Sequence, residues 1–153
     1  VNGIGSVPNG LQSELLRIKL YRYFKSHGYH FSIVISPHAI ISPYATLAEG
    51  AQVMANTVIQ TGAFIGENSI INTAAVIEHD CSIGAHNHIA PGVIISGNVS
   101  TEEQVHIGTG ASVIHGIRIA KLSIVGAGAV ISKDIPAETI VYPAKVFLKG
   151  RKT

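Results

Sequence analysis

The segment Glu78-His79-Asp80 places a histidine between two carboxylates. Histidine is a suitable general base near neutral pH, because the pKa of an unperturbed imidazole is about 6.5. A carboxylate that accepts the other ring N–H fixes the tautomer and stabilises the imidazolium formed during a reaction. Neighbouring residues on a strand point to opposite sides, so adjacency leaves open the alternative that His79 is one polar surface residue among eight histidines. The pattern indicates proton-transfer chemistry at His79.

A six-residue repeat must position this histidine. Every sixth residue from Ile35 to Ile131 is Ile, Leu or Val at sixteen of seventeen positions, and Thr101 is the exception. Four residues after each comes a second, mostly small series that includes Ala39 and Cys81. A helix has a period near 3.6 residues and a simple strand a period of two, so neither would keep a strict six-residue period over this length. The repeat predicts a parallel β-helix, with β-branched residues inside and small ones near its corners.

This repeat resembles that of the hexapeptide-repeat acyltransferases, whose left-handed parallel β-helix is triangular and has three hexads per coil. The resemblance implies an all-β solenoid of a little under six coils for the seventeen hexads. Its handedness is implied by the resemblance alone, because crossovers between parallel strands are in general right-handed.

Three hexads per coil place residues eighteen apart above one another, about 4.8 Å apart, the usual spacing of paired strands. His79, Gly97 and His115 are therefore expected to form one column, and His88 and His106 another. Because glycine has no side chain, a ligand can approach the backbone at Gly97 while His79 reaches toward it from the coil below. A base beside an exposed N–H is what acyl transfer needs.

A closer resemblance is to acetyl-CoA-dependent acetyltransferases that act on nucleotide-linked amino sugars and on sialic acids. It rests on residues 77–84, 88–91 and 97–99, and on Tyr142-Pro143-Ala144-Lys145, with Val141 where the family motif has glycine. The resemblance implies that His79 is the general base and that Glu78 or, as we favour, Asp80 orients it. It places His88 beside the thioester of acetyl-CoA and the N–H of Gly97 against the acetyl carbonyl.

The resemblance also implies the reaction and the assembly. His79 removes a proton from a sugar amine as that amine attacks the thioester, and the N–H of Gly97 meets the oxyanion. Sialic acid O-acetylation is the alternative. No protein nucleophile is required, and Cys81 is expected to be a buried, inert thiol. We expect a homotrimer with acetyl-CoA between subunits, acting on a small-molecule sugar in bacterial surface-glycan biosynthesis.

The later coils suggest where acetyl-CoA would lie. Gly108 and Gly126 are eighteen apart and would form a bare strip for an extended pantetheine arm, with Thr109 and Ala127 beside them. The alternative is that these glycines serve only the tight corners. The basic residues of the C-terminal tail could attract the phosphates of CoA, or they are simply solvated. These are Lys145, Lys149, Arg151 and Lys152.

Three other functions remain as rivals. A metal hydrase resembling the γ-type carbonic anhydrases would need three histidines, but none follows His115 to complete a site with His79, so we expect no metal. A non-catalytic scaffold would present a regular outward array, whereas the outward positions here vary. A member that binds CoA without transferring acetyl is favoured by the lack of a long loop to hold an acceptor.

The repeat divides the chain into three parts. Residues 34–135 form the predicted β-helix. Residues 1–33 are expected to be the remnant of an N-terminal α/β domain, with a strand at Val1–Gly5, a helix within Leu11–His27 and a stop at Gly28. The family resemblance implies that this domain binds the sugar nucleotide. Residues 136–153 are expected to form a cap over the last coil and a basic tail.

Composition excludes several broad classes. Of 153 residues, 46% are apolar and 13% charged, which excludes a disordered chain, and a net charge of +2 gives no case for nucleic acid. The longest uncharged stretch, residues 26–48, contains prolines, histidines and serines, so we expect no membrane span. The single cysteine predicts a reducing compartment, and with no signal peptide we expect a cytoplasmic protein.

Overall fold

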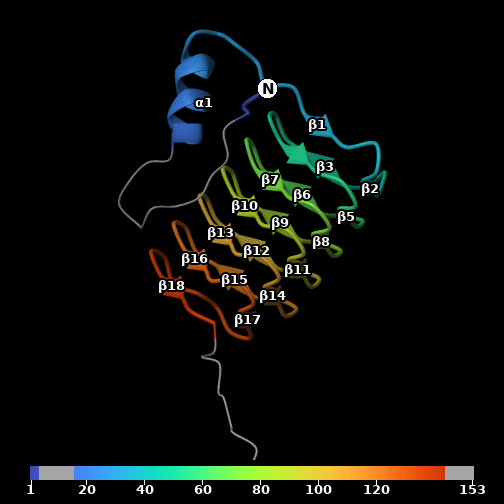
Figure 1. Cartoon of the computed structure of the whole chain (residues 1–153), viewed down its shortest axis with the longest axis vertical. Helices are drawn as coiled ribbons and strands as arrows, with labels where there is room; N and C mark the ends of the chain where they lie inside the picture. The colour runs from blue at the N-terminus through green and yellow to red at the C-terminus, as the bar shows by residue number, and fades with distance from the viewer. Residues whose placement is uncertain (4–15, 144–153) are drawn as a thin grey trace, which may run out of the picture.

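The computed structural model describes residues 1–3 and 16–143. The chain winds into a solenoid in which each coil contributes one two-residue strand to each of three parallel sheets (Figure 1). Sheet A contains, in spatial order, β1 (Val34–Ile35), β4 (Gln52–Val53), β7 (Ile70–Ile71), β10 (His88–Ile89), β13 (His106–Ile107), β16 (Ile124–Val125) and β18 (Ile140–Val141). Sheet B contains β2 (Ile40–Ile41), β5 (Val58–Ile59), β8 (Val76–Ile77), β11 (Ile94–Ile95), β14 (Ser112–Val113) and β17 (Val130–Ile131). Sheet C contains β3 (Thr46–Leu47), β6 (Phe64–Ile65), β9 (Ser82–Ile83), β12 (Ser100–Thr101) and β15 (Arg118–Ile119).

The strand register confirms the repeat. The second residue of every strand from β1 to β17 is one of the seventeen positions of the six-residue series. Within the repeat, paired residues are eighteen apart, as Ile89 with Ile107 in sheet A and Ile95 with Val113 in sheet B. The expected parallel β-helix is therefore confirmed, and its three-strand coil agrees with the left-handed form.

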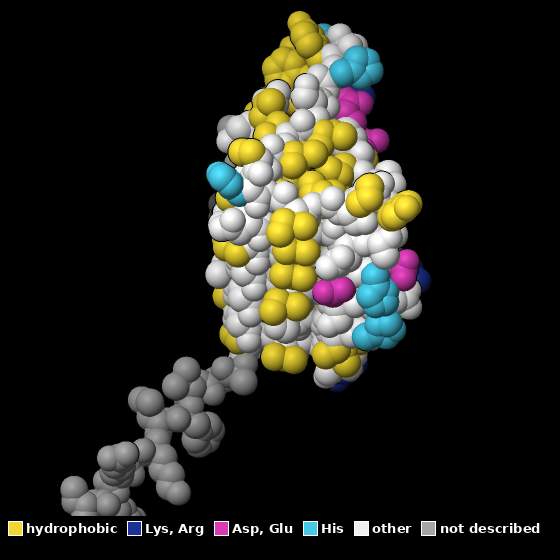
Figure 2. All heavy atoms as spheres, turned by 90° about the vertical axis from the view of Figure 1, so that its right-hand side faces the viewer, with side chains coloured by type: hydrophobic (Ala, Val, Ile, Leu, Met, Phe, Trp, Pro, Cys, Tyr) yellow, Lys and Arg dark blue, Asp and Glu magenta, His cyan; other side chains and the backbone are white. Residues whose placement is uncertain are grey.

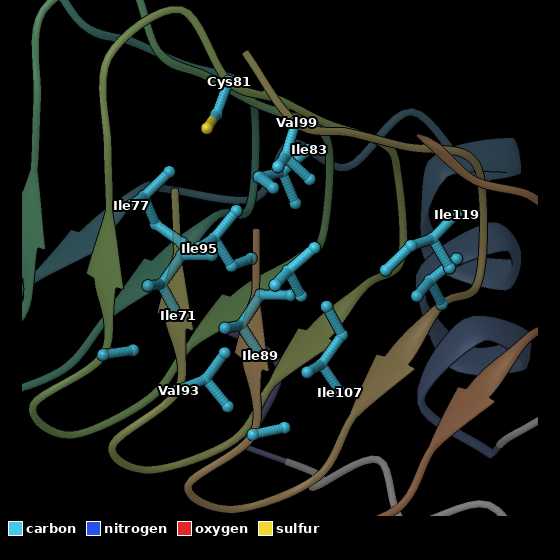
Figure 3. Close-up of a cluster of buried hydrophobic side chains, with 14 of the residues drawn as sticks. Ile71, Ile77, Cys81, Ile83, Ile89, Val93, Ile95, Val99, Ile107 and Ile119 are labelled. Carbon is cyan, nitrogen blue, oxygen red and sulfur yellow. The ribbon is translucent and has the colours of Figure 1, made fainter. Parts of the chain in front are cut away.

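The core is a set of aliphatic ladders inside the three sheets. Ile71, Ile77 and Ile83, one from each sheet, are fully buried and point toward the same axis (Figure 3). The small series lies beside them, with Cys81 and Val93 also buried. In the first coil Ile35 stays 49% exposed, because no coil lies below it. Burial of one such Ile side chain contributes roughly 2 kcal/mol, so the stacking of the coils stabilises the corners between the strands.

Thr101, the exception in the aliphatic series, belongs to a buried polar network. Its Oγ1 accepts hydrogen bonds from Asn87 Nδ2 at 2.8 Å and from the N–H of Gly84 at 3.1 Å. Asn87 is 1% exposed, and its Nδ2 also donates to the carbonyl of Glu102. A buried amide without partners would cost about 1–3 kcal/mol, and Asn87 avoids this cost with the acceptors of Gly84, Thr101 and Glu102.

The solenoid continues past residue 135 in a shortened coil. Ile135 bridges Ile119, and β18 pairs with β16, so Ile140 lies beside Ile124 at an offset of sixteen residues instead of eighteen. This partial coil covers the inward side chains of the coil before it. The basic tail that we expected to follow lies outside the described residues.

Helix α1 (Leu16–Ser26) packs against the corner between sheets C and A. Tyr21 is 3% exposed and donates a hydrogen bond to Glu67, and Lys25 pairs with Glu49 at 2.7 Å. The expected stop is present: Gly28, with φ +80°, donates its N–H to the carbonyl of Lys25. The rest of the predicted helix and most of the predicted N-terminal strand lie outside the described residues. No helix in residues 1–3 and 16–143 could cross a membrane.

Candidate active site

His79 stands at the corner where β8 leads into sheet C, and it forms a close pair with the next residue. Its Nδ1 lies 2.9 Å from Asp80 Oδ2, while both side chains are at least half-exposed to solvent. If Nδ1 carries the proton and donates it to Asp80, Nε2 is left as the acceptor that faces solvent. Within the described chain, Glu78 makes no hydrogen bond to this ring. The structure therefore pairs His79 with Asp80, as favoured from the sequence.

The predicted column of His79, Gly97 and His115 is present. A Cβ on Gly97 would lie 2.4 Å from His79 Nε2, so the imidazole occupies the space where a side chain would stand. The ring centroids of His79 and His115 are 6.2 Å apart, with Gly97 in the coil between them. Within the described chain no acceptor is found for the N–H of Gly97. A half-exposed base thus lies against a glycine whose N–H donates to no acceptor in the described residues, and acyl transfer uses these two groups.

A second site is an open groove of about 450 Å³ at the corner between sheets A and B. His88 and His106 line it, with ring centroids 5.0 Å apart in an edge-to-face arrangement. All the remaining residues that we expected to bind acetyl-CoA, except Gly97, line the same groove. These are Gly108, Thr109, Gly126 and Ala127.

The two glycines of the groove also have a packing role. A Cβ on Gly108 would lie 2.6 Å from the N atom of Ala127 in the next coil, and one on Gly126 would lie 2.9 Å from the carbonyl oxygen of Val141. A side chain at either position would therefore push neighbouring coils apart. The alternative that these glycines serve the tight corners thus has direct support, although both residues also line the groove.

The groove and the His79 column lie at opposite ends of the strands of sheet B. Pro91 in the groove lies in the corner before β11, and Gly97 lies in the corner after it. The outer face of sheet B between them carries an apolar stripe, visible along the middle of Figure 2 with histidine and acidic side chains beside it. The stripe consists of Ile40, Val58, Val76, Ile94 and Val130, with Ser112 between the last two, and Ile40 and Val130 are about 70% exposed.

Two residues of these sites, Asn72 and Gly62, were not predicted from the sequence. Asn72 lines the groove, and its Nδ2 lies 3.3 Å from His88 Nε2. Asn72 is eighteen residues before Ala90, in the column that continues to Gly108, so following that column downward would have found it. Gly62 lies eighteen residues below Asp80, and a Cβ there would be 2.3 Å from Asp80 Oδ1.

Other reactive groups near the column have structural roles. Cys81 is 1% exposed, and burial raises the pKa of its thiol, which keeps it protonated and inert. His79 and His115 form a pair, but across residues 1–3 and 16–143 no three His, Cys, Asp or Glu side chains are grouped as metal ligands would be.

Known proteins share this architecture. The bacterial transferase hexapeptide family (six repeats) matches residues 62–97, which include His79 and Gly97. Fold and sequence together show a parallel β-helix built on a six-residue repeat. The matching segment ends within the column that we identify as the candidate active site.

Three solved structures resemble the chain over most of its length, and two of them are acetyltransferases. A histidine-to-asparagine variant of perosamine N-acetyltransferase from Caulobacter crescentus, in complex with CoA and GDP-perosamine, is 41% identical, with a TM-score of 0.80 over 88% of this chain and 65% of that one. The acetyltransferase domain of PglB from Neisseria gonorrhoeae, in complex with acetyl coenzyme A, is 36% identical, with a TM-score of 0.79 over 86% of this chain and 65% of that one. WeeI from Acinetobacter baumannii is 26% identical, with a TM-score of 0.78 over 92% of this chain and 79% of that one. The chain thus spans 65% of the length of the first two proteins.

Proposed function

We propose that the protein is an acetyl-CoA-dependent acetyltransferase that acts on the amine of a nucleotide-linked amino sugar. The observation that carries this proposal is the column in which His79 pairs with Asp80 and lies against Gly97. Two similar proteins support the choice of substrates, because one binds CoA together with GDP-perosamine and the other binds acetyl-CoA. Such a reaction belongs to bacterial surface-glycan biosynthesis.

In the proposed reaction, Nε2 of His79 takes a proton from the sugar amine as its nitrogen attacks the thioester carbonyl carbon. The C–N bond forms, and the N–H of Gly97 stabilises the oxyanion of the tetrahedral intermediate. When the C–S bond breaks, His79 returns the proton to the leaving CoA sulfur. Asp80 holds the imidazole in the reactive tautomer and stabilises the imidazolium between these two transfers.

The groove is the proposed site for the long arm of acetyl-CoA. It is open, and Gly108, Thr109, Gly126 and Ala127 line it with small side chains or none, which suits an extended chain. His88 lies at the same groove and is the proposed neighbour of the thioester end. The groove and His79 lie at opposite edges of sheet B, so one subunit alone does not place them together.

A homotrimer would bring the two half-sites together, with the groove of one subunit facing the His79 column of the next. The apolar stripe on sheet B supports this assembly, because large exposed apolar patches are typical of interaction surfaces. Activity that returns when a His79→Ala chain is mixed with a Thr109→Trp chain, whose substitution is at an exposed residue of the groove, would support the shared site. Two inactive variants that stay inactive after being refolded together would contradict it.

We also propose a cytoplasmic location. The single cysteine, Cys81, is free and buried, which suits a reducing compartment.

The experiment that tests the function is a thiol-release assay. Acetyl-CoA is supplied with a panel of GDP- and UDP-linked amino sugars and with free sialic acids, and the product is analysed by mass spectrometry. We expect an amide product from a nucleotide amino sugar, and a His79→Gln variant should lose about 10²- to 10⁴-fold in kcat while it still binds CoA. An ester product on a sialic acid would replace the proposed acceptor. CoA binding without any transfer would refute the function.

A further inference from the structure

The carboxylate of Asp80 lies directly over Gly62 in the coil below. A Cβ on Gly62 would be 3.4 Å from Asp80 Cγ, an ordinary contact, but only 2.3 Å from Asp80 Oδ1, closer than side-chain atoms approach. The other carboxylate oxygen, Oδ2, is the one that contacts His79 Nδ1 at 2.9 Å. One oxygen therefore packs on Gly62 while the other holds the imidazole.

The backbone at this corner does not by itself require glycine. Gly62 has φ +71°, but Asp80 and Asn98, the next two residues in the same column, have φ 58° and 56°. Corresponding corners elsewhere accept even Ala74 and Leu122, with φ 57° and 60°. A side chain at residue 62 is thus compatible with the turn, and the neighbour that it would meet is the carboxylate of Asp80.

We propose that Gly62 is a positioning residue of the active site, because the space left by its missing side chain seats the carboxylate that orients His79. This proposal rests on the proposed function of His79. With an alanine at residue 62, Asp80 Oδ1 must move by about 1 Å to reach an ordinary contact of 3.4 Å, and Oδ2 moves with it. The imidazole then loses the partner that fixes its tautomer, although neither His79 nor Asp80 has been changed.

The test compares Gly62→Ala with Gly116→Ala. Gly116 lies in the same column with φ +75°, and nothing lies within 4 Å of the position of its Cβ, so this control carries the backbone strain alone. We expect kcat to fall about 10²-fold in Gly62→Ala and to change less than threefold in Gly116→Ala, with the KM for acetyl-CoA unchanged in both. Equal losses in both variants would overturn the proposal.

A double variant distinguishes the positioning of the Asp80 carboxylate by Gly62 from a general packing role of this glycine. If Gly62 acts through Asp80, Gly62→Ala adds no further loss in an Asp80→Ala background. Multiplying losses would contradict the proposal. If Gly62→Ala alone does not fold, the double variant still decides: it folds when only the carboxylate stands in the way, and it stays unfolded when the backbone requires glycine.

A spectroscopic measurement separates this proposal from the proposed function. Long-range ¹H–¹⁵N spectra at alkaline pH report which ring nitrogen carries the proton, and the signals of His79 are assigned by their loss in His79→Gln. We expect the Nδ1–H tautomer in the wild-type protein and a shift toward Nε2–H in Gly62→Ala. An unshifted tautomer would refute the role of Gly62 even if the enzyme is active. A shifted tautomer in a protein without transferase activity would refute only the function.

Discussion

The tight contact between Gly97 and His79 makes Gly97→Ala a sharp test of the candidate active site. The added methyl group would lie 2.4 Å from Nε2, 2.6 Å from Cε1 and 3.0 Å from Cδ2 of the imidazole. The ring is the end of a half-exposed side chain, so it can move, and it must shift by about 1 Å to restore an ordinary contact of 3.4 Å. A displacement of this size in a reacting group costs about 10²-fold in rate, or roughly 2.7 kcal/mol of transition-state stabilisation.

The same substitution leaves the fold intact. Gly97 is not among the glycines with positive φ, so alanine is compatible with its backbone conformation. Replacing glycine at such a position reduces the entropy of the unfolded chain, a gain of about 0.4–1 kcal/mol that offsets the cost of moving a solvent-facing ring. We therefore expect a Tm within a few degrees of the wild-type value, measured by circular dichroism, together with the loss of kcat in the thiol-release assay.

Two controls make the result interpretable. Gly116→Ala adds a methyl group to the same corner without a neighbour within 4 Å and should keep its activity. In a His79→Ala background, Gly97→Ala should cause no further loss, because the ring that it displaces is absent. The reasoning fails if Gly97→Ala retains the wild-type rate, or if its loss is fully preserved after His79 has been removed.

Three further predictions concern the fold and the assembly. Ile83→Ala, at a position with no exposed surface, should lower the free energy of unfolding by about 2–5 kcal/mol in a urea titration, and a loss below 1 kcal/mol would contradict the packed core. Hydrogen bonds from Lys25 and from the N–H of Phe31 lower the pKa of Glu49 from its ordinary value of 4.5 to about 2. The stabilisation from Glu49 is therefore present above pH 4.5 and is lost as the pH falls toward 2. In Glu49→Gln the free energy of unfolding should depend less on pH between these values. An unchanged pH profile would argue against the contact. Ile94→Lys places a charge in the apolar stripe and should reduce the mass measured by light scattering to that of a single chain, whereas a mass that stays at three chains would place the subunit interface elsewhere.

The six-residue series predicted the solenoid because its signal is repeated seventeen times and each repeat satisfies the same packing requirement. The six-residue series is interrupted where local contacts differ from those of the repeating core. Thr101 interrupts it, and its hydroxyl accepts hydrogen bonds from the buried Asn87 and from the N–H of Gly84. The last coil is two residues shorter than the period, so β18 pairs with β16 although the hexad pattern had ended. The contacts of α1 with Glu49 and Glu67 depend on no repeat, so spacing alone could not reveal them.

The candidate active site was predictable to the extent that it depends on stacking. Eighteen-residue spacing correctly placed Gly97 between His79 and His115, because coil height is fixed by the hydrogen bonds of the sheets. Side-chain direction was not fixed in the same way. Alternation along a strand would send Asp80 and His79 to opposite sides, but Asp80 lies in a corner with φ 58°, and its carboxylate meets the imidazole.

The space that holds that carboxylate is left by Gly62, one coil below. The inward series is held to aliphatic and small residues by the core, whereas the corners accept residues as different as Leu122, Asp80 and Gly116. Variation in a corner therefore costs the fold little, and at Gly62 the corner residue meets the equivalent residue of the next coil, Asp80. Chemistry in such a protein can be built from a vertical column, in which a missing side chain in one coil positions a reactive group in the next.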